Sequence, residues 1–368
     1  MIRLIISIAF LLVSLLTICK APEYYLWMLA ILVTEFPWIF ILLTSVLLLT
    51  GFYTNKYQLT GTITGIAALV LFTSPIFRAY KVANSLKQNL TETFGPHSGS
   101  DQTPFSFWKQ FSLTKRVAAR ALRYNKNLTL DYYPSTISGS KPCIVVVHGG
   151  SWSGGDNKQL PELNSYLASI GYNVASINYR LAPNYKNPAP VEDVQDAMNY
   201  LRHHSEELHI DTGNFVLLGR SAGAQIALLA AYAYKQPGLK AVIDYYGPAD
   251  MVWGYSAPAN PLVMDSRKVM ENYLGGTYKQ ATEKYAASSP LEFVNSQSLP
   301  TLILHGDNDV LVSPEHSRRL NIKLQQKGIK HFLLKLPWAT HGFDYNLHGP
   351  GGQLATYTVE RFLKFVTS

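Results

Sequence analysis

The chain of 368 residues is poor in cysteine and in charge. It has only two cysteines, Cys19 in an apolar N-terminal stretch and Cys143 in a run of β-branched residues, so no disulfide between them is expected. No spacing of His and Cys resembles a zinc site. Charged residues make up 15% of the chain and give a net charge of +8, without a dense basic run. This pattern argues against a nucleic-acid partner and suits a membrane surface that carries anionic lipid.

Charge is scarcest in residues 1–80, which contain three long apolar stretches. Stretches of about twenty apolar residues have the length that a bilayer core demands. We therefore expect residues 1–80 to be a membrane region with three transmembrane helices, the middle one kinked or displaced near Pro37. Glu35 is expected near an interface, where the cost of burying it is avoided. The apolar stretches are 2–18, 26–52 and 59–77.

The first apolar stretch has an alternative interpretation as a cleavable signal peptide. Arg3 precedes an apolar core of suitable length, but no small-x-small cleavage pattern follows between Ile18 and Pro22. An uncleaved helix is therefore the preferred interpretation.

Basic residues between the expected spans bear on orientation. With three spans, the N-terminus and Lys56 lie on one side of the membrane. The basic residues expected on the other side are Lys20, Arg78, Lys81 and Lys87. Their excess predicts that the rest of the chain lies on the cytoplasmic side.

Residues 81–124 are expected to form a linker and a pre-domain segment ahead of a domain over residues 125–368. Asn, Gly, Ser, Thr and Pro dominate the first part of this segment. A cluster of aromatic residues follows, and three roles stay open for it: docking on the domain, covering its entrance, or lying at the membrane interface. The cluster consists of Phe105, Phe107, Trp108 and Phe111.

A strand, a tight turn and a helix are expected around Ser221. The apolar run 215–218 leads into Gly-Arg-Ser-Ala-Gly at 219–223, and an alanine-rich stretch follows. The flanking glycines let the strand and helix backbones come close, which forces the serine into strained dihedral angles and exposes its Oγ atom. In this context, Gly-x-Ser-x-Gly predicts a nucleophilic serine.

A second loop of small residues follows the apolar run 142–147, which reads as a fully buried strand. The loop begins His148-Gly149-Gly150-Ser151-Trp152. Successive backbone N–H groups in such a loop can point at one spot, as a developing oxyanion requires. An ordinary turn between a strand and a helix is the alternative.

Two further buried runs are followed by a carboxylate and by a histidine. Asp307 and Asp309 follow the run 301–304, and either is placed to orient an imidazole. His341 follows the run 332–336. Ser, Asp and His thus occur in an order that fits a catalytic triad, with His348 as the alternative base.

Residues 125–368 resemble an α/β-hydrolase, a fold with a mostly parallel central sheet flanked by helices. The resemblance is to carboxylesterases related to hormone-sensitive lipase, and within them to acetyl esterases and kynurenine-formamidase-like enzymes. It rests on the two loops described above and on two further motifs. These motifs are Asn-Tyr-Arg-Leu-Ala-Pro at 178–183 and Pro-Ala-Pro-Val-Glu-Asp-Val at 188–194.

The resemblance implies a serine hydrolase that needs no metal or organic cofactor. Ser221 is the implied nucleophile and His341 the implied base. Asp309 rather than Asp307 is implied as the partner of His341, because the family pattern is His-Gly-x-x-Asp-x-x-Val. The implied oxyanion hole consists of Gly149, Gly150, Ser151 and Ala222.

Two positions depart from the family pattern. Arg220 stands where relatives often carry an acidic or amide residue, and Ser151 stands where many carry a third glycine. A serine still supplies a backbone N–H group, so the expected oxyanion hole survives the second change.

The expected activity is hydrolysis of small carboxylic esters with short to medium acyl groups by a membrane-anchored enzyme, with lipid-derived esters among the candidates. An arylformamidase or an isoprenylcysteine-methylesterase-like hydrolase would use the same triad. A non-catalytic binding protein is disfavoured because all three triad residues are present. Side chains between residues 251 and 300 are expected either to line an acyl pocket or to pack that insertion on the core. They are Met251, Val252, Trp253, Tyr255, Leu262, Met264, Tyr273 and Leu274.

Overall fold

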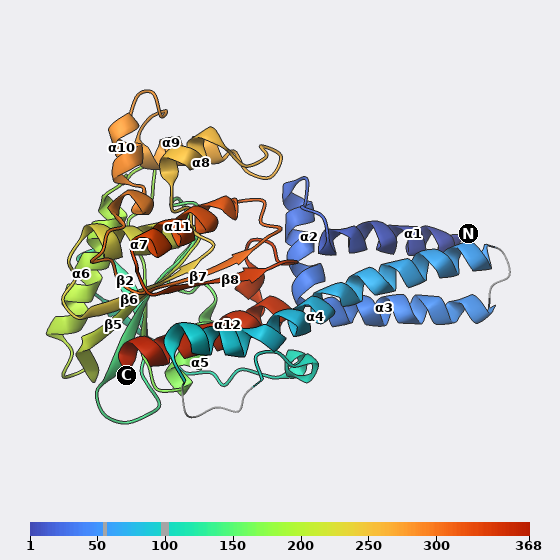
Figure 1. Cartoon of the computed structure of the whole chain (residues 1–368), viewed down its shortest axis with the longest axis horizontal. Helices are drawn as coiled ribbons and strands as arrows, with labels where there is room; N and C mark the ends of the chain where they lie inside the picture. The colour runs from blue at the N-terminus through green and yellow to red at the C-terminus, as the bar shows by residue number, and fades with distance from the viewer. Residues whose placement is uncertain (54–56, 97–102) are drawn as a thin grey trace.

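The computed structural model describes residues 1–53, 57–96 and 103–368, which form an α/β body and a bundle of helices that projects from it (Figure 1). An eight-stranded sheet runs through the body in the order β1-β2-β4-β3-β5-β6-β7-β8. β2 is antiparallel to β1 and β4, and the remaining pairs are parallel. The mostly parallel sheet expected from the sequence is therefore confirmed. The strands are β1 (Arg120–Arg123), β2 (Thr129–Tyr133), β3 (Lys141–Val147), β4 (Asn173–Ile177), β5 (Ile210–Arg220), β6 (Leu239–Tyr245), β7 (Thr301–Gly306) and β8 (His331–Leu336).

Both faces of the central strands are buried, which explains their uninterrupted apolar sequences. On β3, Val145 and Val147 belong to one hydrophobic cluster, whereas Ile144 and Val146 belong to another on the opposite face. The first cluster includes side chains of α6, α7 and α11, and the second includes side chains of α4, α5 and α12. These helices are α4 (Gln58–Phe94), α5 (Pro161–Ser169), α6 (Ala189–His203), α7 (Ala222–Ala233), α11 (Glu315–Gln326) and α12 (Pro350–Thr367).

The insertion between β6 and β7 carries three short helices. Met251, Tyr273 and Leu274 are buried in the first cluster, so these side chains pack the insertion onto the core. Leu262, in contrast, is 71% exposed. The helices are α8 (Met251–Ser256), α9 (Ser266–Leu274) and α10 (Thr282–Ala287).

The N-terminal residues form the projecting bundle together with one helix that lies across its base. α1, α3 and the first half of α4 run side by side, and α2 lies between this bundle and the body (Figure 1). The chain bends by 85° between α2 and α3, at the break before Pro37, so the predicted kink is confirmed. The expected second span over 26–52 is therefore not one straight helix. The helices are α1 (Ile2–Ser14), α2 (Tyr24–Glu35) and α3 (Pro37–Leu49).

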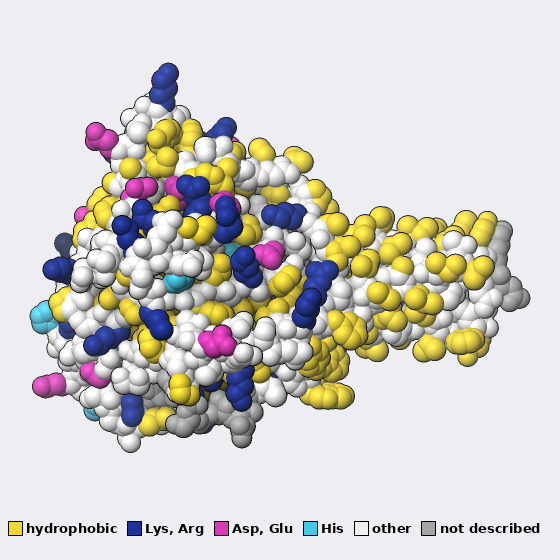
Figure 2. Space-filling view, in the orientation of Figure 1, with side chains coloured by type: hydrophobic (Ala, Val, Ile, Leu, Met, Phe, Trp, Pro, Cys, Tyr) yellow, Lys and Arg dark blue, Asp and Glu magenta, His cyan; other side chains and the backbone are white. Residues whose placement is uncertain are grey.

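Among the described helices, one is long and apolar enough to cross a membrane by itself, namely α4. The bent pair Tyr24–Glu35 and Pro37–Tyr53 counts as a second if it is taken as one broken span, and Ile2–Thr17 is a shorter apolar helix. The expectation of three full-length spans is thus not matched by helix length. On the face shown in Figure 2, hydrophobic side chains cover the bundle, whereas charged side chains lie on the body.

The expected boundary at residue 80 falls inside α4, which continues without a break to Phe94. The second half of this helix packs against α12 through Leu86, Leu90 and Phe94, all of them buried. Their spacing of four residues places them on one face of a helix. The linker interpretation is therefore wrong for residues 81–94, and residues 97–102 lie outside the described part of the chain.

The aromatic cluster of residues 105–111 docks on the outside of the body beside the bundle. Phe105 is buried against Tyr80 of α4, with ring centroids 4.8 Å apart, and Phe111 meets Trp38 of α3 at 5.3 Å. Trp108 is 77% exposed. Docking on the domain is therefore observed, and no aromatic residue of this cluster lines the cavities described below, so a cover over the entrance is not. The role at a membrane interface stays open.

Glu35 is fully buried at the end of α2, which contradicts the expectation that its burial is avoided. Its Oε2 atom accepts the N–H of Gly351 at 2.8 Å, and its backbone oxygen accepts the side-chain amide of Asn346 at 2.7 Å. A buried carboxyl oxygen at the N-terminus of α12 is an acceptor for the otherwise unpaired N–H groups of that first turn. The helix terminus thus provides the polar partner that the apolar sequence around Glu35 does not reveal.

Replacing Glu35 by Ala should lower the thermal unfolding midpoint of the full chain in detergent. Loss of a helix cap costs about 0.5–2 kcal/mol, because the N–H groups of α12 lose their acceptor. Glu92→Ala, at an exposed position of α4, is the matched control and should leave the midpoint unchanged. Equal midpoints for wild type and Glu35→Ala would contradict this role.

Candidate active site

Ser221 lies at the sharp turn between β5 and α7 and has a backbone conformation that L-residues rarely adopt. Its φ is 52° and its ψ is −122°. A Cβ atom at residue 219 would lie 2.3 Å from the backbone oxygen of Gly223, and one at residue 223 would lie 2.3 Å from the oxygens of Val147 and His148. Only glycine fits at both positions. The strained serine turn expected from the sequence is confirmed.

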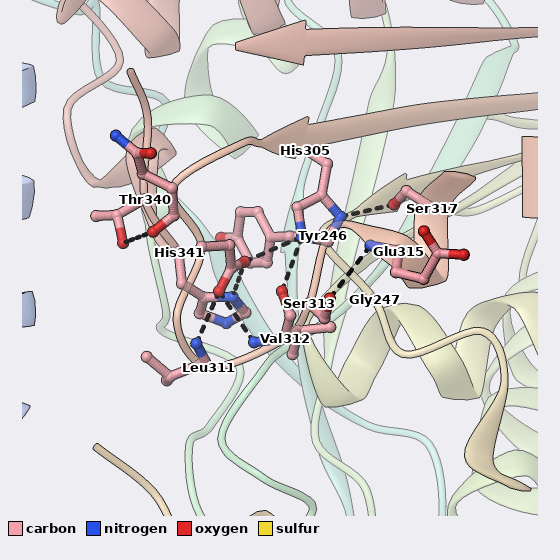
Figure 3. A network of polar contacts seen from close by, with 12 residues as sticks. Tyr246, Gly247, His305, Leu311, Val312, Ser313, Glu315, Ser317, Thr340 and His341 are labelled. Atoms are coloured by element: carbon pink, nitrogen blue, oxygen red, sulfur yellow. Dashed lines mark hydrogen bonds and ion pairs between the residues drawn. The ribbon is translucent and has the colours of Figure 1, made fainter. Parts of the chain in front are cut away.

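Asp309 and His341 meet at the carboxyl ends of β7 and β8. The Nδ1 atom of His341 lies 2.7 Å from Asp309 Oδ2, and Asp309 is 2% exposed. The other carboxylate oxygen accepts the backbone N–H groups of Leu311 and Val312, both at 2.9 Å. Figure 3 shows His341, Leu311 and Val312 converging on this point. The structure thus brings Asp309 to His341, whereas Asp307 is exposed.

A second histidine also holds Asp309. His305 Nε2 lies 3.1 Å from Asp309 Oδ2, and its Nδ1 lies 2.6 Å from Ser317 Oγ. Burial by itself would raise the pKa of the Asp309 carboxyl, but the charges and hydrogen bonds of His341 and His305 outweigh it and hold this pKa well below its usual range. The carboxylate is therefore ionised at neutral pH. No short sequence motif indicates this second contact of Asp309.

Ser221 and His341 line the same cavity of about 390 Å³. Within the described residues, Ser221 Oγ has no hydrogen-bond partner in the protein, so its contact with His341 stays a prediction. Catalytic hydrogen bonds are often long in structures without substrate. The alternative base, His348, lies elsewhere, with its Nε2 atom 2.9 Å from Thr114 Oγ1.

The predicted oxyanion residues surround Ser221 but are not equivalent. The N–H of Gly149 donates to Gln159 Oε1 at 2.8 Å, so Gly149 is not available as an oxyanion donor, contrary to our expectation. Over the described ranges, the backbone N–H groups of Gly150, Ser151 and Ala222 have no acceptor in the protein. These three residues remain the candidate donors.

His148 fixes the start of the loop that carries Gly150 and Ser151. Its Nδ1 atom lies 2.7 Å from the oxygen of Gly149, and its ring stacks on Tyr179 with centroids 4.2 Å apart. The following residues Ser151 and Trp152 have φ values of 54° and 59°. Such strain turns successive N–H groups in one direction.

Arg220, the first departure from the family pattern, links the turn around Ser221 to the loop after β8 that carries His341. Its Nε atom donates to Asp344 Oδ2 at 2.5 Å, and both side chains are buried. Tyr246 O–H donates to the other oxygen of Asp344, and the Tyr246 ring lies 4.3 Å from the ring of His341. This contact was missed because no local sequence pattern links Arg220 to Asp344.

A second contact that the sequence did not reveal comes from α2. The indole N–H of Trp27 donates to the backbone oxygen of His341 at 3.0 Å. The N-terminal region therefore contacts the residue that is the candidate base.

A larger cavity of about 540 Å³ meets the first one at Ser221. Its walls are mostly apolar and come partly from the insertion, including Trp253 and Met264. Both open roles of the insertion are thus observed, since these two side chains line the cavity while Met251 and Tyr273 are buried in the core. No group of three or more His, Cys, Asp or Glu in the described part of the chain could hold a metal ion.

Comparisons with known proteins point to the same part of the chain. The sequence profile of the BD-FAE family matches residues 130–324, more than half of the chain. The chain is 29% identical over 216 residues to esterase LipQ of Mycobacterium tuberculosis, which covers 55% of this chain and 50% of LipQ. It is 28% identical over 244 residues to the probable carboxylic ester hydrolase LipM of the same species. This match covers 62% of this chain and 55% of LipM. The chain spans about half the length of these curated relatives.

Solved structures show the fold. A hyperthermophilic esterase of the archaeon Pyrobaculum calidifontis matches with a TM-score of 0.58 and 20% identity over 79% of this chain and 97% of its own. The esterase Est2 of Thermogutta terrifontis matches with a TM-score of 0.55 and 23% identity. This match covers 67% of this chain and 91% of Est2. Together with the strand order, these matches show that residues 120–368 have the α/β-hydrolase fold.

Replacing Asp344 by Asn should destabilise the protein strongly. Arg220 is 2% exposed, so loss of its charged partner leaves an uncompensated buried cation, which typically costs about 3–5 kcal/mol. The measurement is chemical unfolding of the full chain in detergent. Asp307→Asn, at an exposed loop position, is the control. Unchanged stability of Asp344→Asn would show that the ion pair is not needed for folding.

Asp244 predicts a pH dependence of stability. Burial raises the pKa of this carboxyl to about 7, although the N–H of Gly247 and the charge of His305 oppose the rise. Because this folded-state pKa lies above the unfolded-state pKa, protonated Asp244 stabilises the folded state. The contribution is complete below the unfolded-state pKa and is lost as the pH rises through about 7.

Asp244→Asn stays uncharged and keeps an oxygen acceptor for the N–H of Gly247. The thermal unfolding midpoint of this variant should therefore rise relative to that of wild type as the pH is raised from about 5 to about 8. Two curves that stay parallel across this range would contradict the assignment. Asp307→Asn should run parallel to wild type throughout.

Proposed function

Because the chain belongs to the BD-FAE family, we propose that it is a serine hydrolase that cleaves carboxylic esters. The observation that carries the proposal is the buried contact of 2.7 Å between Asp309 and His341 beside the strained Ser221. The names of the curated relatives LipQ and LipM, an esterase and a probable carboxylic ester hydrolase, support the same reaction class.

In the proposed mechanism, Ser221 Oγ attacks the acyl carbonyl carbon while His341 Nε2 takes the serine proton. Asp309 accepts the Nδ1–H of His341, which fixes the tautomer that leaves Nε2 free as a base. The carbonyl oxygen becomes an oxyanion that the N–H groups of Gly150, Ser151 and Ala222 stabilise.

Collapse of this intermediate breaks the bond between the acyl carbon and the ester oxygen. His341 returns its proton to the leaving alcohol, and the acyl group stays on Ser221. Water then attacks the acyl carbon while His341 takes a proton from it. The bond between the acyl carbon and Ser221 Oγ breaks, His341 returns the proton to Oγ, and the carboxylic acid is released. The residues described above suffice for these steps.

We assign short to medium acyl groups to the larger cavity. Its mostly apolar walls and its volume of about 540 Å³ accommodate a hydrophobic acyl group next to Ser221. Trp152 and Trp253 line this cavity and restrict its shape. We assign the acyl group to this cavity and the alcohol to the cavity of about 390 Å³.

We also propose that the projecting bundle anchors the enzyme in a membrane, with the body on the cytoplasmic side. α4 supports this anchor because it is long and apolar enough to cross a bilayer, and α1 and α3 pack beside it. Large apolar side chains face outward along all three helices, as lipid contact requires. They include Ile5, Leu12, Leu42, Val46, Ile63, Val70 and Phe77.

Hydrolysis of p-nitrophenyl esters from acetyl to palmitoyl tests the proposed function. The full chain in detergent should turn over the short and medium esters best, and Ser221→Ala should lower kcat by roughly 10³-fold or more because the nucleophile is lost. Asp307→Asn is the control that should keep wild-type activity. A folded wild-type protein without turnover above Ser221→Ala would contradict the esterase proposal and favour a formamidase, a narrow methylesterase or a binding role.

A further inference from the structure

The N-terminal region supplies part of the wall of both cavities that meet at Ser221. Lys20, Ala21 and Pro22, which precede α2, line the larger cavity. Tyr24 and Trp27 of α2 line the smaller one. The body alone therefore does not enclose the candidate active site.

Three hydrogen bonds hold this segment on the body. Trp27 donates to the oxygen of His341 at 3.0 Å, and the backbone N–H of Tyr24 donates to the oxygen of Leu262 at 3.1 Å. The side chain of Asn260 donates to the oxygen of Pro22 at 2.9 Å. Of the partners on the body, His341 lies on the loop after β8, and Leu262 and Asn260 belong to the insertion that lines the larger cavity.

The same segment lies at the base of the apolar bundle. It follows α1 and the short 3-10 helix Leu15–Thr17 and leads through α2 into α3, and α2 lies between the bundle and the body (Figure 1). Arg78 of α4 donates to the oxygen of Thr17 at 3.2 Å, so the ends of the apolar helices meet here. Lys20, Pro22 and Tyr24 are exposed and form a rim.

The position of the rim defines the side from which a substrate arrives. If the bundle is embedded in a bilayer, its base lies at the level of the lipid headgroups. Lys20 and Arg78 at this level suit a surface that carries anionic lipid. Aromatic side chains such as Tyr24 and Trp27 suit the same interface, because each combines an apolar ring with a polar group.

We propose that residues 20–27 are a substrate-selecting part of the active site and that the substrate is an amphiphilic ester dissolved in the membrane, which enters the cavities from the headgroup level. This inference rests on the proposed esterase function and deepens it. Tyr24 contacts the part of the substrate that follows the ester oxygen. Trp27 is a positioning residue, because its indole fixes the backbone of His341.

The test compares two esters with one enzyme. The full chain is reconstituted in vesicles of phosphatidylcholine and phosphatidylserine, and kcat/KM is measured for water-soluble p-nitrophenyl acetate and for hexadecyl acetate dissolved in the vesicles. Tyr24→Ala should lower the ratio of membrane-ester to soluble-ester kcat/KM by about tenfold, since truncating one apolar contact costs roughly 1.5 kcal/mol or more. A ratio is insensitive to the fraction of folded protein.

Tyr25→Ala is the matched control, because Tyr25 has the same side chain on the same helix, is 72% exposed and lines neither cavity. It should leave the ratio unchanged. Equal ratios for Tyr24→Ala, Tyr25→Ala and wild type would overturn the inference, as would a wild type that cleaves p-nitrophenyl acetate but not hexadecyl acetate. Cleavage of neither ester would instead refute the esterase function on which the inference rests.

A second variant tests the positioning role. Trp27→Phe keeps an aromatic ring but loses the donor to the His341 oxygen. It should lower kcat for both esters and leave KM unchanged, because the candidate base is less well held while the substrate contacts stay. An unchanged kcat, or a loss that appears mainly in KM, would reduce Trp27 to a packing residue.

Discussion

The close approach of three backbone segments beneath Ser221 is the constraint on which the rest of the site depends. β5 turns into α7 within one residue, and the backbone of β3 runs directly against that turn. Gly219 and Gly223 make this possible, because a Cβ at either position would come within 2.3 Å of a backbone oxygen. The approach places the N–H groups after β3 beside Ser221. The nucleophile and its oxyanion donors are therefore consequences of one packing contact.

The site is completed by contacts over long distances in the sequence. Arg220 reaches Asp344 on the loop of the candidate base, and Trp27 reaches the backbone of His341 from the N-terminal region. Both contacts are made to the same loop after β8. They couple the position of the base to the serine turn and to the helix that lies at the base of the bundle. A membrane anchor that also shapes the active site would link lipid contact to catalysis in one chain.

Features encoded by local patterns were predictable from the sequence, whereas features encoded by distant pairs were not. The turn around Ser221, the buried strands expected from the apolar runs and the choice of Asp309 follow from short motifs that sit at strand ends. Gly149 was misjudged because its N–H is taken by Gln159, ten residues away. Glu35 was misjudged because its partner is the start of α12, which no pattern near Glu35 reveals. The extension of α4 to Phe94 was predictable from the spacing of Leu86, Leu90 and Phe94, but the polar residues between these three positions suggested a linker.

The central claim is that Ser221 forms an acyl-enzyme with the help of His341 and Asp309. Rapid acid quenching during turnover of p-nitrophenyl butyrate, followed by peptide mass spectrometry, tests it most directly. The account predicts a butyryl mass increment on the peptide that contains Ser221, formed in a burst with one p-nitrophenol per enzyme, and no such increment in His341→Ala. A butyryl group on a different residue, or turnover without any acylated peptide, would contradict the account.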